Sequence, residues 1–332
     1  MRMLWIGLFA ALAVASLPAA TVEVVAGGGG GEPGVSARDI RFIEPFGVAF
    51  DRAGNLFVIE YTGGRLIRID RAGKTSLVAG GEAFREPHAI VMNGEDQLFV
   101  ADTHNNRVLR RDVATGATVT VAGNGEKGYS GDGGPATEAA FNGIFAIDLA
   151  PDGKQLYVAD LTNKRVRRID LGTGMVTTVA GNGQEGVPAD GAVAAESPLV
   201  DPRAATADAA GNVYVLERRG NALRVVDTSG RIRTLIEPGD ITPDLNGPKH
   251  LCLDRNGNVI IADAENHLVR RYDVKTGKTT TIVGTGVAGL SIDAADPLKT
   301  QVNRPHGVYV RSDGALYVTD SYNHRILRVT GY

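Results

Sequence analysis

The sequence lacks several features that would point to particular classes of protein. It has one cysteine, Cys252, in 332 residues, so no disulfide can form within the chain. Aromatic residues make up 6% of the chain, and the formal net charge of -3 gives no overall attraction to nucleic acid. No G-x-S-x-G elbow, P-loop or dinucleotide fingerprint lies between a strand and a helix. These absences leave hydrolase, kinase and Rossmann chemistry, and nucleic-acid binding, without support.

Long apolar runs are also missing, except for one at the N-terminus. It extends from about Leu4 to Leu17, follows Arg2 and ends in small residues. Its roughly 14 apolar residues fall short of the ~20 that a spanning helix needs, which favours a cleaved secretory signal over a membrane anchor. We therefore expect a signal peptide in residues 1–20, cut between Ser16 and Thr21. The mature chain, residues 21–332, is then a monomer without membrane insertion, in the periplasm or outside the cell.

What the sequence does contain is one pattern repeated six times. Each copy has three β-branched runs separated by polar turns, and no helix of useful length is predicted. The copies begin at Glu44, Glu86, Phe145, Asp201, Gly247 and Arg304. Five of them are followed by a fourth run, which begins at Lys74, Ala117, Met175, Arg231 and Lys278. Four antiparallel strands per repeat make one blade, so the pattern predicts an all-β fold, a six-bladed β-propeller.

The sixth copy lacks a fourth run before the chain ends at Tyr332. The missing pattern occurs at the mature N-terminus, in Thr21–Gly27. We expect this segment to pair with the C-terminal blade, because closure removes the exposed strand edges that an open array would leave.

Three columns of the aligned copies predict turn structure. Residues typical of a tight hairpin recur between the first and second strands, at Gly54, Asp96, Gly153, Gly211, Gly257 and Gly314. Glycine or asparagine recurs three residues after the second strand, which predicts a left-handed residue at Gly63, Asn105, Asn163, Gly220, Asn266 and Asn323. The second strand always ends in an acid, at Glu60, Asp102, Asp160, Glu217, Asp263 and Asp320. An arginine follows five residues later in four copies, at Arg65, Arg107, Arg165 and Arg325, and we expect it to bridge the turn.

The motif D-x-x-N-x-R, seen as DTHNNR from Asp102, DLTNKR from Asp160 and DSYNHR from Asp320, resembles the NHL repeat. The connector from Val121 is similar to those of exported bacterial NHL proteins, and the resemblance covers residues 21–332. It implies a propeller but not one activity, because the family and its relatives include binding modules, peptidyl-hydroxyglycine lyases and lactonases. RNA binding, which some relatives imply, fits badly with the predicted export and the acidic net charge.

A candidate site lies where the first strands reach the propeller axis. The position after each entrance proline varies, whereas the next position is small in every copy except at His250. We expect the following residues to converge at the channel mouth and to bind a ligand: Phe46, His88, Phe145, Arg203, Lys249, His250 and His306.

Two kinds of occupant suit this set of side chains. Neutral imidazoles of His88, His250 and His306 are zinc ligands by type, as in the lyase relatives, although no local H-x-H spacing supports a metal. Alternatively, Arg203 and Lys249 could hold a carboxylate or phosphate. The SGDGG segment at Ser130 suggests calcium only weakly, because it has one carboxylate and no EF-hand spacing, and we interpret it as a turn.

Two functions follow from these observations. The first is a non-catalytic binding propeller that presents its loop-bearing face and polar channel mouth to a protein, peptide or saccharide ligand, with no cofactor required. The second is a metal-dependent enzyme at the channel mouth, a lyase or lactone hydrolase that uses zinc or calcium. A third hypothesis makes the propeller one subunit of an envelope assembly.

Overall fold

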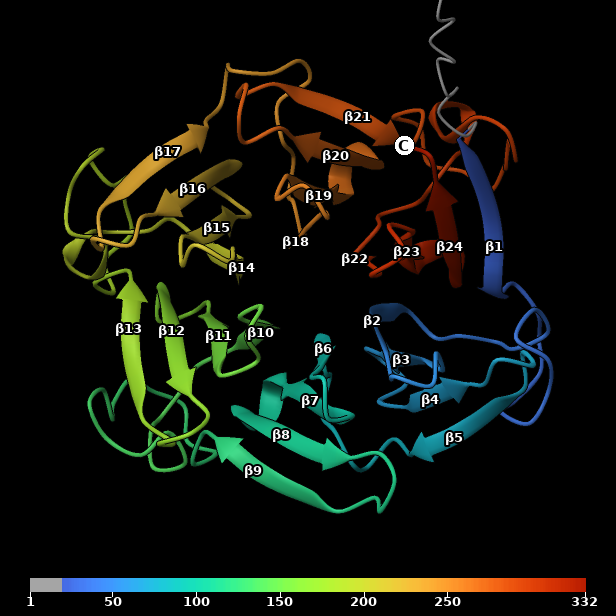
Figure 1. Ribbon diagram of the computed structural model, residues 1–332, viewed down its shortest axis with the longest axis horizontal. Coiled ribbons are helices and arrows are strands. Elements are labelled where there is room, and N and C mark those ends of the chain that lie inside the picture. The colour runs from blue at the N-terminus through green and yellow to red at the C-terminus, as the bar shows by residue number, and fades with distance from the viewer. Residues whose placement is uncertain (1–19) are drawn as a thin grey trace, which may run out of the picture.

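A computed structural model describes residues 20–332, which form six four-stranded antiparallel sheets arranged around one axis (Figure 1). Apart from Ala20, the predicted signal segment lies outside the described residues. The predicted fold, a six-bladed β-propeller, is confirmed. Within residues 20–332 no helix combines the length and the apolar character needed to cross a membrane.

Each blade begins with its innermost strand and ends with its outermost one. The strands of the first three blades are β2 (Pro45–Phe50), β3 (Leu56–Glu60), β4 (Leu66–Ile69) and β5 (Thr75–Ala79); β6 (Ala89–Met92), β7 (Gln97–Asp102), β8 (Arg107–Asp112) and β9 (Thr118–Ala122); and β10 (Ile144–Leu149), β11 (Gln155–Asp160), β12 (Arg165–Asp170) and β13 (Val176–Ala180). Those of blades 4 and 5 are β14 (Pro202–Ala207), β15 (Val213–Glu217), β16 (Ala222–Val226) and β17 (Ile232–Ile236); and β18 (His250–Leu253), β19 (Val259–Asp263), β20 (Leu268–Tyr272) and β21 (Thr279–Val283). Blade 6 contains β22 (Gly307–Val310), β23 (Leu316–Asp320), β24 (Arg325–Thr330) and β1 (Thr21–Gly27).

Short 3-10 turns interrupt the loops. They are η1 (Thr103–Asn105), η2 (Ala194–Glu196), η3 (Ala264–Asn266), η4 (Pro297–Lys299) and η5 (Ser321–Asn323).

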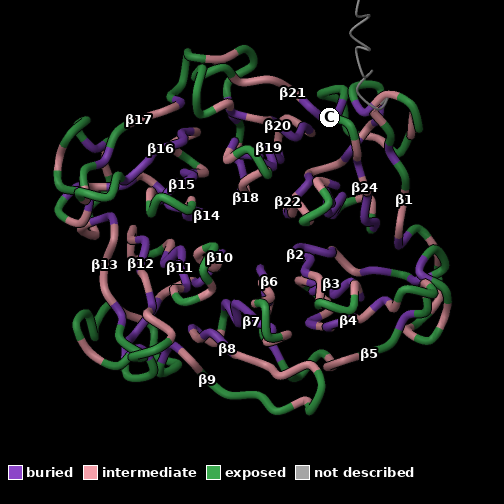
Figure 2. Tube along the Cα trace, viewed as in Figure 1, coloured by how far each residue is buried: buried purple, intermediate pink, exposed green. Residues whose placement is uncertain are grey.

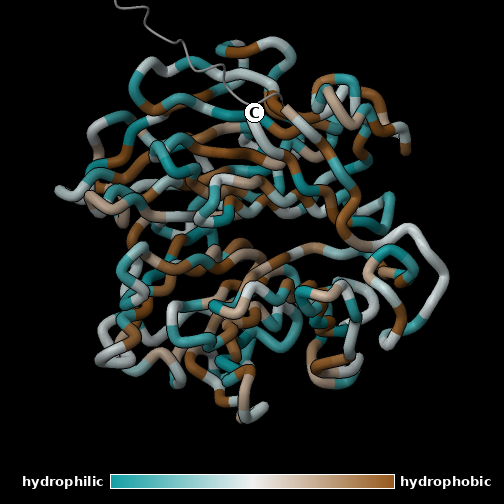
Figure 3. The backbone as a smooth tube through the Cα atoms, turned by 45° about the vertical axis from the view of Figure 1, so that its right-hand side comes forward, coloured by the Kyte–Doolittle hydropathy of each residue, from teal (hydrophilic) through white to brown (hydrophobic). Residues whose placement is uncertain are grey.

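The core lies between the blades. Because successive side chains of a strand point to opposite faces, each sheet presents apolar residues to both of its neighbours. Six clusters of buried apolar side chains result, each dominated by residues of two adjacent blades. Figure 2 shows the inner strands mostly buried and the connecting loops exposed, and Figure 3 shows hydrophobic and hydrophilic positions interspersed along the chain.

The closing strand is the predicted one. β1 lies outside β24, with Thr21 opposite Thr330 and Gly27 opposite Arg325. Val22 and Ala26 are buried in this pairing, at 2% and 0% exposure. The two ends of the described chain therefore complete one sheet, and no blade of the ring is left with three strands.

The hairpin column is confirmed, since all six of its residues have positive φ, including Asp96 at 59°. The second turn column is wrong by one residue. The left-handed residue is the fourth after the strand, namely Gly64, Asn106, Lys164, Asn221, His267 and His324. The predicted asparagines instead donate from Nδ2 to the acid that ends the second strand, for example Asn163 to Asp160 at 2.8 Å. A side-chain hydrogen bond, and not backbone conformation, explains the four asparagines of that column.

The acid–arginine bridge is confirmed in blades 1, 2 and 6, where Arg325 Nε lies 2.7 Å from Asp320 Oδ2. In blade 3 the prediction is wrong, because Arg165 donates to the carbonyls of Asn163 and Asn182. Blades 4 and 5 have no arginine at that position but supply one two residues later. Arg224 pairs with Glu217 and Arg270 with Asp263, each at 2.7 Å. An arginine two residues further along the third strand therefore also pairs with the buried acid that ends the second strand of its blade.

Candidate functional site

The channel mouth is formed by the first residues of the innermost strands. In several blades the residue before the entrance proline is left-handed although it is not glycine, with φ of 52° at Glu44, 49° at Glu86 and 47° at Arg304. The strand ladder then skips one residue, as between Pro45 and Gly47 or between Pro202 and Ala204. Left-handed non-glycine residues are strained, and such strain gathers where the surrounding structure holds a functional conformation.

The residues at this position in neighbouring blades contact one another around the axis. The Phe46 ring stacks on His306 with 3.9 Å between centroids and meets His88 edge-on at 5.3 Å. His88 in turn meets Phe145 at 4.5 Å, and the Arg203 guanidinium lies 4.5 Å over the Phe145 ring. The structure therefore brings together Phe46, His88, Phe145, Arg203 and His306 from five blades.

Two further aromatic rings extend this set, and the sequence analysis missed both. Tyr61, directly after β3, stacks on Phe46 at 4.7 Å, and Tyr322 in η5 stacks on His306 at 6.0 Å. Tyr322 is 40% exposed, so the stack of rings ends in solvent. The only sequence signal was an aromatic residue one or two positions after the acid of the second strand, in two blades of six.

The two mouth histidines are neutral. The Nδ1 atom of His88 lies 3.0 Å from the carbonyl oxygen of Glu86, and that of His306 lies 3.0 Å from the carbonyl oxygen of Arg304. A carbonyl can only accept, so each ring carries its proton on Nδ1 and keeps Nε2 as an acceptor. Burial, and secondly the charge of Arg203, hold the pKa of both rings well below the ordinary value.

One buried and one partly buried cation, Arg203 and Lys249, complete the mouth. Burial lowers the pKa of Arg203 to about 9, and burial together with the Arg203 charge lowers the pKa of Lys249 to about 8. Both side chains therefore remain mostly protonated at pH 7. Lys249 has a partner, Glu265, at 3.4 Å. The mouth thus combines neutral aromatic walls with positive charge.

His250 lies one layer deeper, in the channel. It lines a cavity of about 40 Å³ together with Asp148, Cys252 and Tyr309, and Phe46 and His88 line the same cavity. Its Nδ1 atom has no hydrogen-bond partner in the described part of the chain, and burial lowers its pKa to about 4. A cavity of this size holds a few waters but not an organic ligand.

Asp148 is a second residue that the sequence analysis missed. It accepts a hydrogen bond from the Thr206 hydroxyl at 2.5 Å, and burial raises its pKa to about 6. Its column lies two residues after the small column and faces the same channel. The signal was visible, because Asp148 is the one carboxylate in a column that otherwise has Ala49, Val91, Thr206, Cys252 and Tyr309.

The three histidines proposed as zinc ligands do not share one level of the channel. Among residues 20–332, no three His, Cys, Asp or Glu side chains are grouped closely enough to hold a metal ion. The SGDGG carboxylate, Asp132, is occupied by the guanidinium of Arg167 at 2.6 Å and by the amide and hydroxyl of Thr178. The metal hypotheses therefore gain no geometric argument from the described residues.

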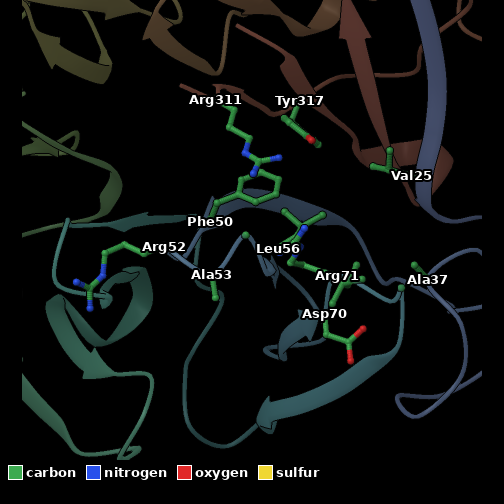
Figure 4. A pocket seen from close by; sticks show the side chains of 13 residues that line it. Val25, Ala37, Phe50, Arg52, Ala53, Leu56, Asp70, Arg71, Arg311 and Tyr317 are labelled. Carbon is green, nitrogen blue, oxygen red and sulfur yellow. The ribbon is translucent and has the colours of Figure 1, made fainter. Parts of the chain in front are cut away.

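A larger pocket of about 570 Å³ lies at the opposite face, between blades 1 and 6. Figure 4 shows the Arg311 guanidinium over the Phe50 ring, 5.0 Å from its centroid, with the Arg52 side chain pointing away from the pocket. Arg52 pairs with Asp96 and Arg311 with Asp313. Because these cations are exposed and paired, the pocket lacks the buried charge that marks the channel mouth.

The fold and this axial channel define a closed six-bladed β-propeller. The sequence profile of the NHL repeat matches residues 84–110, 245–272 and 302–328, which form most of the first three strands of blades 2, 5 and 6. Three of the six repeats therefore match the NHL repeat.

Curated relatives agree with this assignment. The chain is 24% identical to NHL repeat-containing protein 2 of Homo sapiens over 337 residues, which cover 85% of the chain and 46% of that protein. It is 23% identical to SUPPRESSOR OF QUENCHING 1 of Arabidopsis thaliana over 284 residues, 79% of the chain and 27% of that protein. The chain thus spans less than half the length of these relatives.

Solved structures share the fold at low sequence identity. An auxiliary nutrient binding protein from Bacteroides ovatus superposes with a TM-score of 0.70 at 13% identity, covering 94% of this chain and 76% of that one. A streptogramin B lyase superposes with a TM-score of 0.57, also at 13% identity, covering 95% and 98%. Binding proteins and enzymes both use this fold, so the fold alone does not select between them.

Proposed function

We propose that this chain is a non-catalytic binding propeller that holds a protein, peptide or saccharide ligand at its channel mouth. The observation that carries the proposal is the row of stacked rings from Tyr61 through Phe46 and His306 to the exposed Tyr322. Aromatic faces bind sugars and peptide side chains through apolar contact, and a partly exposed ring above buried ones offers a platform for such contact. Polar groups around this row of rings would orient the bound ligand.

The histidines support binding more than proton transfer. With Nδ1 protonated, the Nε2 atoms of His88 and His306 can accept hydrogen bonds from ligand hydroxyl or amide groups. A general base works best with a pKa near the operating pH, and the pKa of each ring lies well below that. The arrangement therefore suits recognition.

The experiment compares two tyrosines of similar exposure on one face of the propeller. Tyr322 is 40% exposed at the mouth, whereas Tyr129 is 43% exposed in the connector between blades 2 and 3, where it packs on Arg165. Purified protein is screened on glycan and peptide arrays. We expect the ligands retained by the wild type to lose at least about tenfold in affinity with Tyr322→Ala and to bind Tyr129→Ala normally. Equal binding by both variants, or turnover of the ligand, would refute the proposal.

The alternative proposal is a metal-dependent lyase or lactone hydrolase. Electrostatics argues against it, because burial and secondly the positive charge of Arg203 lower the pKa of His88, His250 and His306, and the same charge would repel a divalent cation beside them. Elemental analysis of protein purified without chelator tests this alternative. Stoichiometric zinc or calcium that is lost in His88→Ala would support the enzyme.

We also propose that the chain is exported as a monomer after removal of a signal within residues 1–20. The proposal rests on the N-terminal pattern of Arg2, the apolar run and the small residues that follow it. N-terminal sequencing of the protein recovered outside the cytoplasm should give a first residue between Leu17 and Thr21, and light scattering should give the mass of one chain. Retention of Met1 in the exported product would contradict cleavage.

A further inference from the structure

Arg203 is a buried cation without a hydrogen-bond acceptor. The residue is 5% exposed, and its Nε and Nη1 atoms, both inaccessible to solvent, have no partner among residues 20–332. Other buried arginines differ. In the same blade, Arg224 is 2% exposed and donates to Glu217 and to the Thr234 hydroxyl. Burying an uncompensated charge takes away a large part of a domain's stability unless an anion accompanies it.

The nearby carboxylates are committed to other cations. Asp201 accepts from Arg218 Nε at 2.9 Å. Glu265 pairs with Arg304 at 2.5 Å and with Lys249 at 3.4 Å. None of these carboxylates reaches the guanidinium of Arg203, which lies over the Phe145 ring, 4.5 Å from its centroid. A neutral ring does not replace a counter-ion. The chain itself therefore supplies no counter-ion.

We propose that the mouth binds a ligand through a terminal carboxylate, held by Arg203 with Lys249 beside it. A planar guanidinium can hold a carboxylate through two parallel hydrogen bonds, and the Nε and Nη1 atoms of Arg203 have no acceptor among the described residues. Lys249 adds a second positive charge, which the Glu265 carboxylate compensates in part. The inference rests on the proposed function, since it names the group by which the ligand of the same mouth is recognised.

Charge and space favour a carboxylate at the end of a longer molecule over a doubly charged phosphate. Glu44 and Glu86 lie at the entrances of blades 1 and 2, and Glu86 already accepts from the Tyr61 hydroxyl at 2.9 Å. These negative charges around the rim disfavour a dianion. The cavity below the mouth has only about 40 Å³, so the rest of the ligand lies outward, toward the exposed ring of Tyr322.

The first experiment measures melting temperature in sodium acetate or sodium benzoate, with chloride keeping the ionic strength constant. We expect a saturable increase for the wild type, because a ligand that binds only the folded state stabilises it. Arg203→Met should lose this increase and should melt no lower than the wild type in chloride alone, since it removes an unpaired buried charge. A response that persists in Arg203→Met, or a wild type that does not respond, would overturn the proposal.

Arg224→Met is the matched control. It also replaces a buried arginine of blade 4, but it leaves the Glu217 carboxylate, which is 0% exposed, without its partner. We expect it to melt well below the wild type and still to respond to acetate. Lys249→Met gives a second measure that does not depend on Arg203: acetate affinity should fall at least about tenfold. Glu265 keeps Arg304 in this variant, so melting in chloride should change little; unchanged acetate affinity would overturn the role of Lys249.

Further probes identify the source of the carboxylate. A free-acid dipeptide is compared with its amide, and glucuronate with glucose. A response to either acid that its neutral counterpart lacks supports the proposal, and the pair that shows it tells peptide from acidic sugar. Inorganic phosphate binding more tightly than acetate would overturn the assignment to a carboxylate.

The outcomes separate this inference from the proposed function. If an array ligand depends on Tyr322 but binds Arg203→Met normally, the carboxylate inference is wrong and the binding function stands. If acetate stabilises through Arg203 but no array ligand depends on Tyr322, the inference stands and the proposed function is wrong.

Discussion

Gly63 lies against the carboxylate of Glu60, so that a Cβ built on the glycine would come within 2.5 Å of Glu60 Oε2. Gly220 and Glu217 have the same relationship at 3.0 Å. In the other four blades the strand ends in the shorter aspartate and the third residue is asparagine, which donates to it. The two positions are therefore coupled: glutamate requires glycine, and aspartate accommodates asparagine.

This coupling predicts a non-additive double mutant. Gly63→Asn should destabilise the protein by about 2 kcal/mol, because its side chain collides with a carboxylate that is 0% exposed. Adding Glu60→Asp should recover at least about 1 kcal/mol of that loss by recreating the pair found in blade 2. Chemical denaturation of the two single variants and the double variant measures the coupling. Additive losses would contradict it.

The ring should depend on its closing strand. Deleting residues 21–27 from the mature chain removes the partner of β24 and exposes the apolar side that Val22 and Ala26 bury, so we expect a loss of about 3 kcal/mol or more. Thr21→Ala, which removes only an exposed hydroxyl contact with Thr330, serves as control and should melt as the wild type does. An unchanged melting temperature after the deletion would show that closure does not stabilise the ring.

The arginines at the blade turns should differ in their contribution to stability. Arg270→Met leaves the Asp263 carboxylate, which is 0% exposed, without its ion pair, and should cost about 3 to 5 kcal/mol. Arg165→Met removes hydrogen bonds to two carbonyls but no ion pair, and should cost about 1 kcal/mol. Urea unfolding of both variants compares them directly. Equal losses would mean that the buried pair adds nothing.

Asp148 should make stability depend on pH. Its pKa is raised to about 6 in the folded protein, above the ordinary 3.8, so the folded state binds a proton that the unfolded state releases between these values. Stability from this group is therefore present below pH 4 and is lost as the pH rises through 6. Because the side chain lines the channel and keeps some contact with solvent, we expect a change of about 1 to 2 kcal/mol.

Asp148→Asn isolates this effect. The amide keeps an acceptor for the Thr206 hydroxyl but does not titrate. The free energy of unfolding of the variant should therefore increase relative to that of the wild type as the pH rises from 4 to 7. The difference in unfolding free energy between the two proteins, measured across that range, is the readout. A constant difference would show that the carboxyl titrates normally.

Much of the fold could be predicted because propeller blades are local structures. Strand runs and hairpin residues such as Asp96 follow from patterns that recur about every fifty residues, and the pairing of Thr21–Gly27 with β24 follows from the strand that the sixth copy lacks. The left-handed residue was misplaced by one position for a physical reason. Asparagine is both tolerant of positive φ and a good hydrogen-bond donor, and sequence alone does not tell which property is used.

The site was predictable only in part. A variable column, beside one that is small in every copy except at His250, located Phe46, His88 and Arg203 near the axis. The structure places them in a connected set with Phe145 and His306. Tyr61 and Tyr322 escaped notice because they come from a different strand end, and nothing in the sequence tells that their rings stack on Phe46 and His306.

The sequence by itself therefore determined the repeat, the number of blades and the residues of the hairpin between the first and second strands, because these depend on short-range backbone chemistry copied six times. Only the tertiary structure decided which charges are paired. Arg224, Arg270 and Arg203 look alike in sequence, but the first two meet a buried carboxylate while the third meets none. Both ion pairs lie within one blade, between its second and third strands, so whether a buried charge has a counter-ion depends on distances between side-chain atoms that only the folded structure sets.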